Sequence, residues 1–123
     1  MHLLTTNAEL TMRSIQEKIN ADITKKFEQY EFEPVVVKMI SNIGYWSIQP
    51  DDECYEHGRV YFDFQGDYTI FKIEIKGQKI ESQPGREGYY DFMIKTKDND
   101  KYRNFIDIVD TKLHQLRDDL NAE

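Results

Sequence analysis

Residues 58 to 77 read GRVYFDFQGDYTIFKIEIKG, and their pattern of apolar and polar residues predicts the centre of a β-sheet. Apolar and polar residues alternate on both sides of Gly66-Asp67, which is typical of strands that bury one face. Two such runs around a two-residue turn with glycine in the first position predict a tight β-hairpin. Each step outward from the turn then pairs two residues whose numbers sum to 133.

This pairing divides the hairpin into two faces. Phe62 falls opposite Phe71 on one face, and Tyr61 falls opposite Lys72 on the other. A slip of one residue would mix the two sets, so the pattern itself specifies the register. We expect a core face made of Val60, Phe62, Phe64, Phe71, Ile73 and Phe92. We expect an outer face that carries Tyr61, Tyr68 and Ile70.

Further strands are predicted on both sides of the hairpin. Residues 34 to 50, PVVVKMISNIGYWSIQP, are rich in β-branched and aromatic residues. Whether Ser41 to Gly44 forms a hairpin turn or a bulge in one bent strand stays open. Gly77-Gln78 predicts a second tight turn, followed by a short strand paired with the preceding one. The alternating segment YYDFMIKT, residues 89 to 96, is predicted to be the last strand.

An amphipathic helix is predicted at each end of the chain. From Ala8 to Tyr30, apolar residues recur at steps of three and four, and Pro34 is expected to end this helix. From Tyr102 to Leu120 a second apolar stripe follows Asp98 or Asn99, either of which suits an N-cap. Each apolar stripe needs a hydrophobic partner, and one face of the sheet can cover both.

Length and composition agree with one folded domain. The chain has 123 residues, of which 39% are hydrophobic and 13% aromatic, enough to build a core. The predicted fold class is therefore α+β, in a single domain that spans residues 1–123. We expect an antiparallel β-meander of four to five strands, with an N-terminal and a C-terminal helix packed on one face.

The charge of the chain limits its partners. The formal net charge is −7, from 16 basic and 23 acidic residues, which disfavours direct contact with nucleic-acid phosphates and favours a basic protein partner. No segment has the apolar length of a membrane span, and the first residues do not resemble a signal peptide. The single Cys54 cannot form an intramolecular disulfide. These features predict a cytoplasmic protein that binds neither membrane nor nucleic acid.

The segment DDECYEH, from Asp51 to His57, is the densest group of metal-ligand residue types. Its spacing matches no calcium loop or zinc motif, so a solvated loop is the first expectation. The alternative is that this loop binds a metal ion or a small ligand. No nucleophile motif lies near any of the three histidines. We therefore predict no catalytic residue, no cofactor and no metal, and a protein that is not an enzyme.

Two predicted surfaces suit a protein partner. Tyrosines anchor many interfaces, so the outer face of the sheet is one candidate, and the acidic side of the last helix is the other. The loop QPGREG adds an arginine at its tip. The predicted partner-binding residues are Tyr61, Tyr68, Ile70, Arg86, Asp107, Asp110 and Asp118.

The sequence therefore favours one function, that of a non-enzymatic acidic module that inhibits or neutralises a larger basic protein. Immunity proteins and phage-type inhibitors of nucleic-acid enzymes or defence systems act in this way, with acids steering association and tyrosines anchoring it. One alternative is a domain that binds a metal or ligand at the Asp51 to His57 loop. The other is a secretion-type chaperone or a homodimeric structural subunit.

Overall fold

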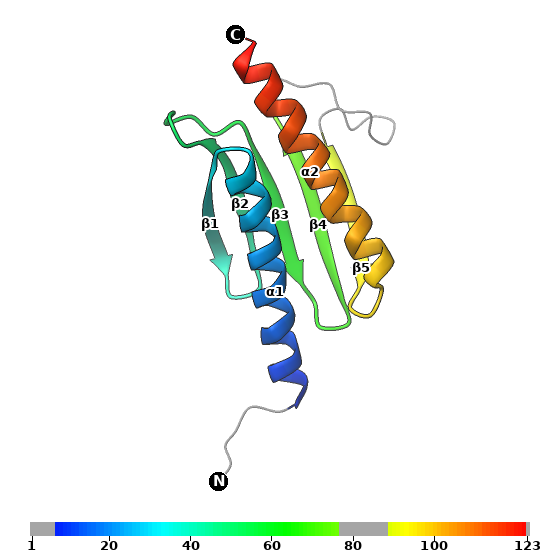
Figure 1. Cartoon of the computed structure of the whole chain (residues 1–123). Helices are drawn as coiled ribbons and strands as arrows, with labels where there is room; N and C mark the ends of the chain where they lie inside the picture. The colour runs from blue at the N-terminus through cyan, green and yellow to red at the C-terminus, as the bar shows by residue number, and fades with distance from the viewer. Residues whose placement is uncertain (1–6, 77–88, 123) are drawn as a thin grey trace.

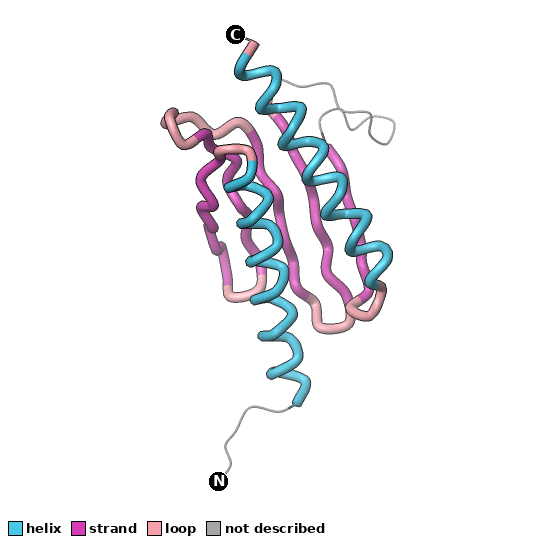
Figure 2. The backbone as a smooth tube through the Cα atoms, viewed as in Figure 1, coloured by secondary structure: helices cyan, strands magenta, loops and turns pink. Residues whose placement is uncertain are grey.

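The computed structural model describes residues 7–76 and 89–122, and it confirms the α+β fold. Figure 1 shows both helices lying across the same face of a five-stranded sheet. Figure 2 shows turns and loops at the ends of the sheet joining the strands between residues 32 and 75. The elements are α1 (Asn7–Gln29), β1 (Phe32–Ile40), β2 (Ile43–Pro50), β3 (Gly58–Phe64), β4 (Tyr68–Ile75), β5 (Tyr89–Lys95) and α2 (Asn99–Asn121).

The sheet is an antiparallel meander in the order β1-β2-β3-β4-β5. The register predicted for the β3–β4 hairpin is confirmed at every pair, including Phe62 opposite Phe71. Gly66 has a φ of 78°, and the Gln65 amide donates to the Tyr68 carbonyl at 2.9 Å. The Asp67 amide also donates to the Gln65 carbonyl at 2.9 Å, so the chain reverses through a tight turn centred on Gly66, whose positive φ a glycine adopts easily.

The neighbouring strands settle what the sequence left open. Residues 35 to 49 form a hairpin, because Ile40 pairs with Ile43 across a two-residue turn. The predicted turn at Gly77-Gln78 lies outside the described residues. The short strand predicted beyond that turn also lies outside the described residues, and in the structure Tyr89 of β5 lies opposite Glu74.

Pro34 does not end the first helix, contrary to the prediction. Helix α1 ends at Gln29, and Glu31 follows with a left-handed φ of 61°. The exposed carbonyls at this helix end are capped from α2, because Arg117 donates from Nε to the Tyr30 carbonyl at 2.8 Å. It also donates from Nη2 to the Glu31 carbonyl at 2.7 Å. A tertiary contact therefore stabilises the end that the local sequence did not specify.

Pro34 lies inside β1, which is an edge strand paired only with β2. Backbone groups in an antiparallel pair point alternately toward the partner strand and away from it. Ile48 lies opposite Pro34, and its carbonyl accepts from the His57 amide on the β3 side. The Pro34 nitrogen therefore faces outward, where the missing N–H removes no ladder hydrogen bond.

The core lies between the helices and one face of the sheet, as predicted. Phe105 of α2 stacks on Phe71 of β4, with ring centroids 4.2 Å apart, and Trp46 lies 4.8 Å from Phe62. Among the residues that the structure describes, every buried side-chain nitrogen or oxygen has a hydrogen-bond partner. The buried apolar residues include Ile19, Ile23, Phe27, Phe32, Trp46, Ile48, Val60, Phe62, Phe64, Phe71, Ile73, Ile75, Ile94, Phe105, Val109, Leu113 and Leu116.

Candidate functional site

The face of the sheet that points away from α1 and α2 is called the open face, and no described element packs over it. Its apolar side chains are partly exposed, with 39% of Val35, 36% of Val37 and 62% of Met93 accessible. Surfaces of this kind on a folded protein mark contact sites more often than isolated exposed residues do. By register, the open face carries Val35, Val37, Ile43, Tyr45, Tyr61, Tyr68, Ile70 and Met93.

The strand register arranges these side chains in rows across the sheet. The central row runs Val37, Tyr45, Tyr61, Lys72 and Asp91, from β1 to β5. The adjacent row contains Ile43, Asp63, Ile70 and Met93. The structure therefore brings the predicted residues Tyr61 and Ile70 together on neighbouring strands. It places Tyr68 on the same face at the turn end of β4, opposite Lys95.

Arg59 is the central cation of the open face. Its guanidinium lies over the Tyr45 ring, with Cζ 4.2 Å from the centroid, and Nη1 donates to the Tyr61 hydroxyl at 3.4 Å. Its Nε donates to Glu56 Oε1 at 2.6 Å. The hydrogen bond to Glu56, with that to Tyr61, raises the pKa of Arg59 above its ordinary value. Arg59 is therefore a permanent charge held in one orientation between two tyrosines.

Glu56 fastens the β2–β3 loop to the open face. Its carboxylate accepts from Ser47 Oγ at 2.7 Å and from Lys76 Nζ at 2.9 Å, in addition to Arg59. Partial burial by itself would raise the pKa of Glu56, but hydrogen bonds from Ser47, Lys76 and Arg59 outweigh it. The pKa of Glu56 is therefore lowered, and the group is ionised at neutral pH.

The loop from Asp51 to His57 was the alternative metal site, but several of its side chains contact other residues of this chain. Besides Glu56, Glu53 Oε2 lies 3.0 Å from His57 Nε2. Cys54 is exposed. Within residues 7–76 and 89–122, no three His, Cys, Asp or Glu side chains are grouped so that they could hold a metal ion.

The acidic residues predicted on α2 lie away from the open face, because α2 covers the other side of the sheet. Asp107 and Asp118 are exposed there, and Asp118 lies 3.5 Å from His114. Asp110 instead joins the two helices, because its Oδ1 accepts from Lys26 Nζ at 3.0 Å and from the Tyr30 hydroxyl at 2.9 Å. Arg86 lies outside the described residues.

Burial would raise the pKa of Asp110, but the hydrogen bonds from Lys26 and Tyr30 outweigh this and lower it. A carboxylate that already holds two donors on its own chain is less able to bind a partner than an exposed one. The structure thus divides the predicted residues into an open-face group, an exposed pair on α2, and one helix–helix contact.

Sequence reasoning left Tyr45 out of the predicted site and did not assign Arg59 a role in it. The turn at Ser41 and Asn42 would have revealed β2 as a separate strand with Tyr45 opposite Val37, and the register of β2 against β3 places Tyr45 opposite Tyr61. Their rings are 5.6 Å apart. The role of Arg59 depends on Glu56, which the β2–β3 loop brings close to the open face. No periodic pattern in the sequence predicts the path of that loop.

Comparisons with family models, curated proteins and solved structures found no match for this chain. No helix in the described part of the chain is both long and apolar enough to cross a membrane. The fold and the site define the class as an α+β protein in which two helices cover one face of an antiparallel meander and the other face carries aromatic side chains.

Proposed function

We propose that this protein is a binding module that masks a larger, more basic protein through the open face of its sheet. The observation that carries the proposal is the row of Val37, Tyr45 and Tyr61, beside Arg59, on a face that no described element covers. Tyrosine and arginine are the residue types that most often anchor protein interfaces.

The anchors are held in place before any partner arrives. Arg59 is fixed by Glu56 and stacked on Tyr45, so binding orders little additional side-chain freedom. The exposed aliphatic side chains of Val35 and Val37 lie on the same face and offer apolar area that a partner can bury. A rigid aromatic centre with an apolar flank is the arrangement expected of a protein-binding surface.

Charge supports a basic partner. The net charge is −7, and one end of the molecule, here called the acidic end, gathers the β2–β3 loop and the C-terminal ends of both helices. The Asp51 amide donates to the Glu31 carbonyl, and Arg117 reaches the same carbonyl from α2. Both helix dipoles add negative potential there. The described exposed acids of this end are Glu28, Glu31, Glu33, Asp51, Asp52, Glu53, Asp118 and Asp119.

The acidic end adjoins the open face, because the loop that contains Glu56 belongs to both. Negative potential there would steer a basic protein toward the anchors and raise the association rate. This is the mode of action of an immunity protein or a phage-type inhibitor, and a nucleic-acid enzyme has the basic surface required. We place the protein in the cytoplasm, where an exposed thiol such as Cys54 stays reduced.

The test begins with affinity capture of the full chain from its native cells, followed by titration with the purified partner. We expect a partner of positive net charge and at least tenfold weaker binding by the double variant Tyr61→Ala and Tyr68→Ala. Tyr55→Ala is the matched control, because Tyr55 is 73% exposed but lies on the β2–β3 loop, outside the strand rows that carry the proposed anchors. It should bind as the parent chain does.

Two outcomes would overturn the proposal. One is a partner whose affinity is unchanged in the double variant, which would place its binding site elsewhere. The other is a concentration-dependent dimer in sedimentation that the same two substitutions abolish, which would assign the open face to a second copy of this chain.

A further inference from the structure

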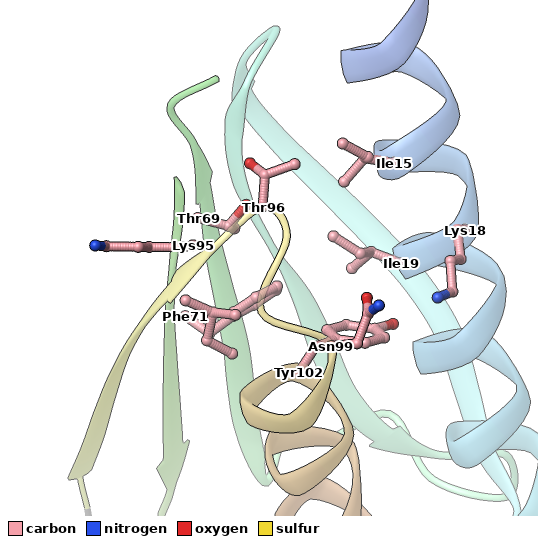
Figure 3. Close-up of a pocket in the computed structure, with 10 residues that line it drawn as sticks. Ile15, Lys18, Ile19, Thr69, Phe71, Lys95, Thr96, Asn99 and Tyr102 are labelled. Carbon is pink, nitrogen blue, oxygen red and sulfur yellow. The ribbon is translucent and has the colours of Figure 1, made fainter. Parts of the chain in front are cut away.

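A cavity of about 120 Å³ lies on the helix side of the sheet, between α1, the start of α2, and the strands β4 and β5. Its apolar lining is formed by Ile15, Ile19, Phe71 and Ile94. Figure 3 shows Ile15 and Ile19 pointing into it from α1, while Tyr102 and Asn99 approach from α2. The cavity is therefore walled by both helices and floored by the sheet.

A groove between the two helices adjoins the cavity and shares Lys18, Asn99 and Tyr102 with it. Lys18 Nζ lies 5.2 Å from the centroid of the Tyr102 ring, so a cation is held at the junction of cavity and groove. Figure 3 shows the Lys18 side chain directed toward Tyr102.

The groove is basic, in a chain whose net charge is negative. Lys25, Lys26 and Arg103 line it together with Lys18. Among the described residues that line it, the only acid is Asp22, which already accepts from the Tyr102 hydroxyl at 2.6 Å. Burial and this hydrogen bond raise the pKa of Tyr102, so the phenol stays protonated and keeps the carboxylate occupied.

The cations of the groove differ in their availability. Lys26 forms an ion pair with Asp110 at 3.0 Å. Within the described residues, Lys18, Lys25 and Arg103 make no ion pair. An anion placed at the junction of cavity and groove would therefore find free positive charge on both helices.

We propose that the cavity and the groove bind a small organic anion with a short apolar tail, such as a linear monocarboxylate. The tail occupies the cavity, and the carboxylate lies between Lys18 and Arg103. A cavity of about 150 Å³ holds benzene, so a cavity of this size accepts a tail of about five carbons. This site lies on the opposite side of the sheet from the open face and does not depend on the function proposed above.

The size of the cavity leads to a chain-length rule. Each methylene moved out of water strengthens binding about fourfold, so hexanoate should bind about fifteenfold more tightly than butanoate. Octanoate should gain little over hexanoate, because the cavity is full. Hexanol, which has the tail but no charge, should bind at least fivefold more weakly than hexanoate.

The experiment titrates the isotope-labelled full chain with butanoate, hexanoate, octanoate and hexanol, followed by NMR. We expect saturable shifts at amides around Thr69, Phe71 and Ile94. The double variant Lys18→Ala and Arg103→Ala should weaken hexanoate about tenfold while leaving hexanol unchanged. Lys101→Ala, on the same turn of α2 but outside the cavity and groove, is the matched control and should not change either affinity.

Thr69→Leu tests the cavity itself, because Thr69 lines it and is only 6% exposed. A variant that stays folded by circular dichroism should lose the preference of hexanoate over butanoate. Three results would overturn the proposal: equal affinity for hexanol and hexanoate, no gain from butanoate to hexanoate, or equal losses in Lys101→Ala and in the double variant.

Discussion

Glu56→Gln is expected to destabilise the fold by about 2 kcal/mol at neutral pH, because one carboxylate holds three donors. Its side chain is 20% exposed, and those of Arg59 and Lys76 are 32% and 52% exposed. The hydrogen bonds from Arg59 and Ser47 are each worth about 1 kcal/mol at such sites, whereas the exposed Lys76 pair adds a few tenths at most. Glutamine keeps one acceptor oxygen, but it loses the negative charge and its NH₂ group would face Arg59 or Lys76.

The effect should depend on pH in a direction that the lowered pKa of Glu56 fixes. A carboxyl whose folded pKa lies below its unfolded value stabilises the fold above the unfolded value of about 4.3. This contribution is lost as the pH falls through the folded pKa. The difference in unfolding free energy between the parent chain and Glu56→Gln should therefore shrink as the pH falls below about 4.3.

Urea denaturation at pH 7 and pH 3 measures this difference, with Glu53→Gln as the control. Glu53 Oε2 lies 3.0 Å from His57 Nε2 and its side chain is 39% exposed, so its loss should cost less than about 0.5 kcal/mol. The reasoning is refuted if Glu56→Gln unfolds within 0.5 kcal/mol of the parent at pH 7. A difference that is the same at both pH values would equally contradict it, because charge would then not be its origin.

Further predictions concern the end of α1 and the β1–β2 hairpin, and denaturant unfolding checks each of them. Arg117→Ala should cost about 2 kcal/mol, because it removes two hydrogen bonds to backbone carbonyls and the contact with Phe32, whose ring centroid lies 4.7 Å from the guanidinium. Arg103→Ala on the same helix should cost little. Glu31→Gly should stabilise by about 0.5–1 kcal/mol, since φ is 61° there. Gly44→Ala should cost about 2–3 kcal/mol, because the added Cβ would lie within 3 Å of both the Val37 carbonyl and the Phe62 ring.

Sequence reasoning succeeded where the determining interactions are local. The β3–β4 register followed from a glycine that can adopt positive φ and from alternation with a period of two, and both act within a few residues. The helical stripes were equally local, and the residues that they placed on the core, such as Phe27 and Phe105, are fully buried.

Prediction from the sequence failed where the structure of a segment depends on the helix or strand beside it. The effect of Pro34 depends on whether its nitrogen faces a partner strand, and that is decided by β1 being at the edge of the sheet. Asp110 lies on the polar side of its own helix, yet Lys26 of α1 and Tyr30, just after the end of α1, bind it. The cavity was not predicted, because it exists only where two helices and two strands meet.

The two proposed sites can be tested separately because β4 presents alternate residues to them. Thr69 and Phe71 line the cavity, while Ile70 and Lys72 face the opposite side of the sheet. Replacing Tyr61 and Tyr68 removes atoms from the open face only, so carboxylate binding should persist in that variant. Conversely, Lys18 and Arg103 can be replaced without touching the anchors of the open face. If either pair of substitutions abolished both activities, unfolding or a change in the whole sheet would be the cause, and circular dichroism would detect it.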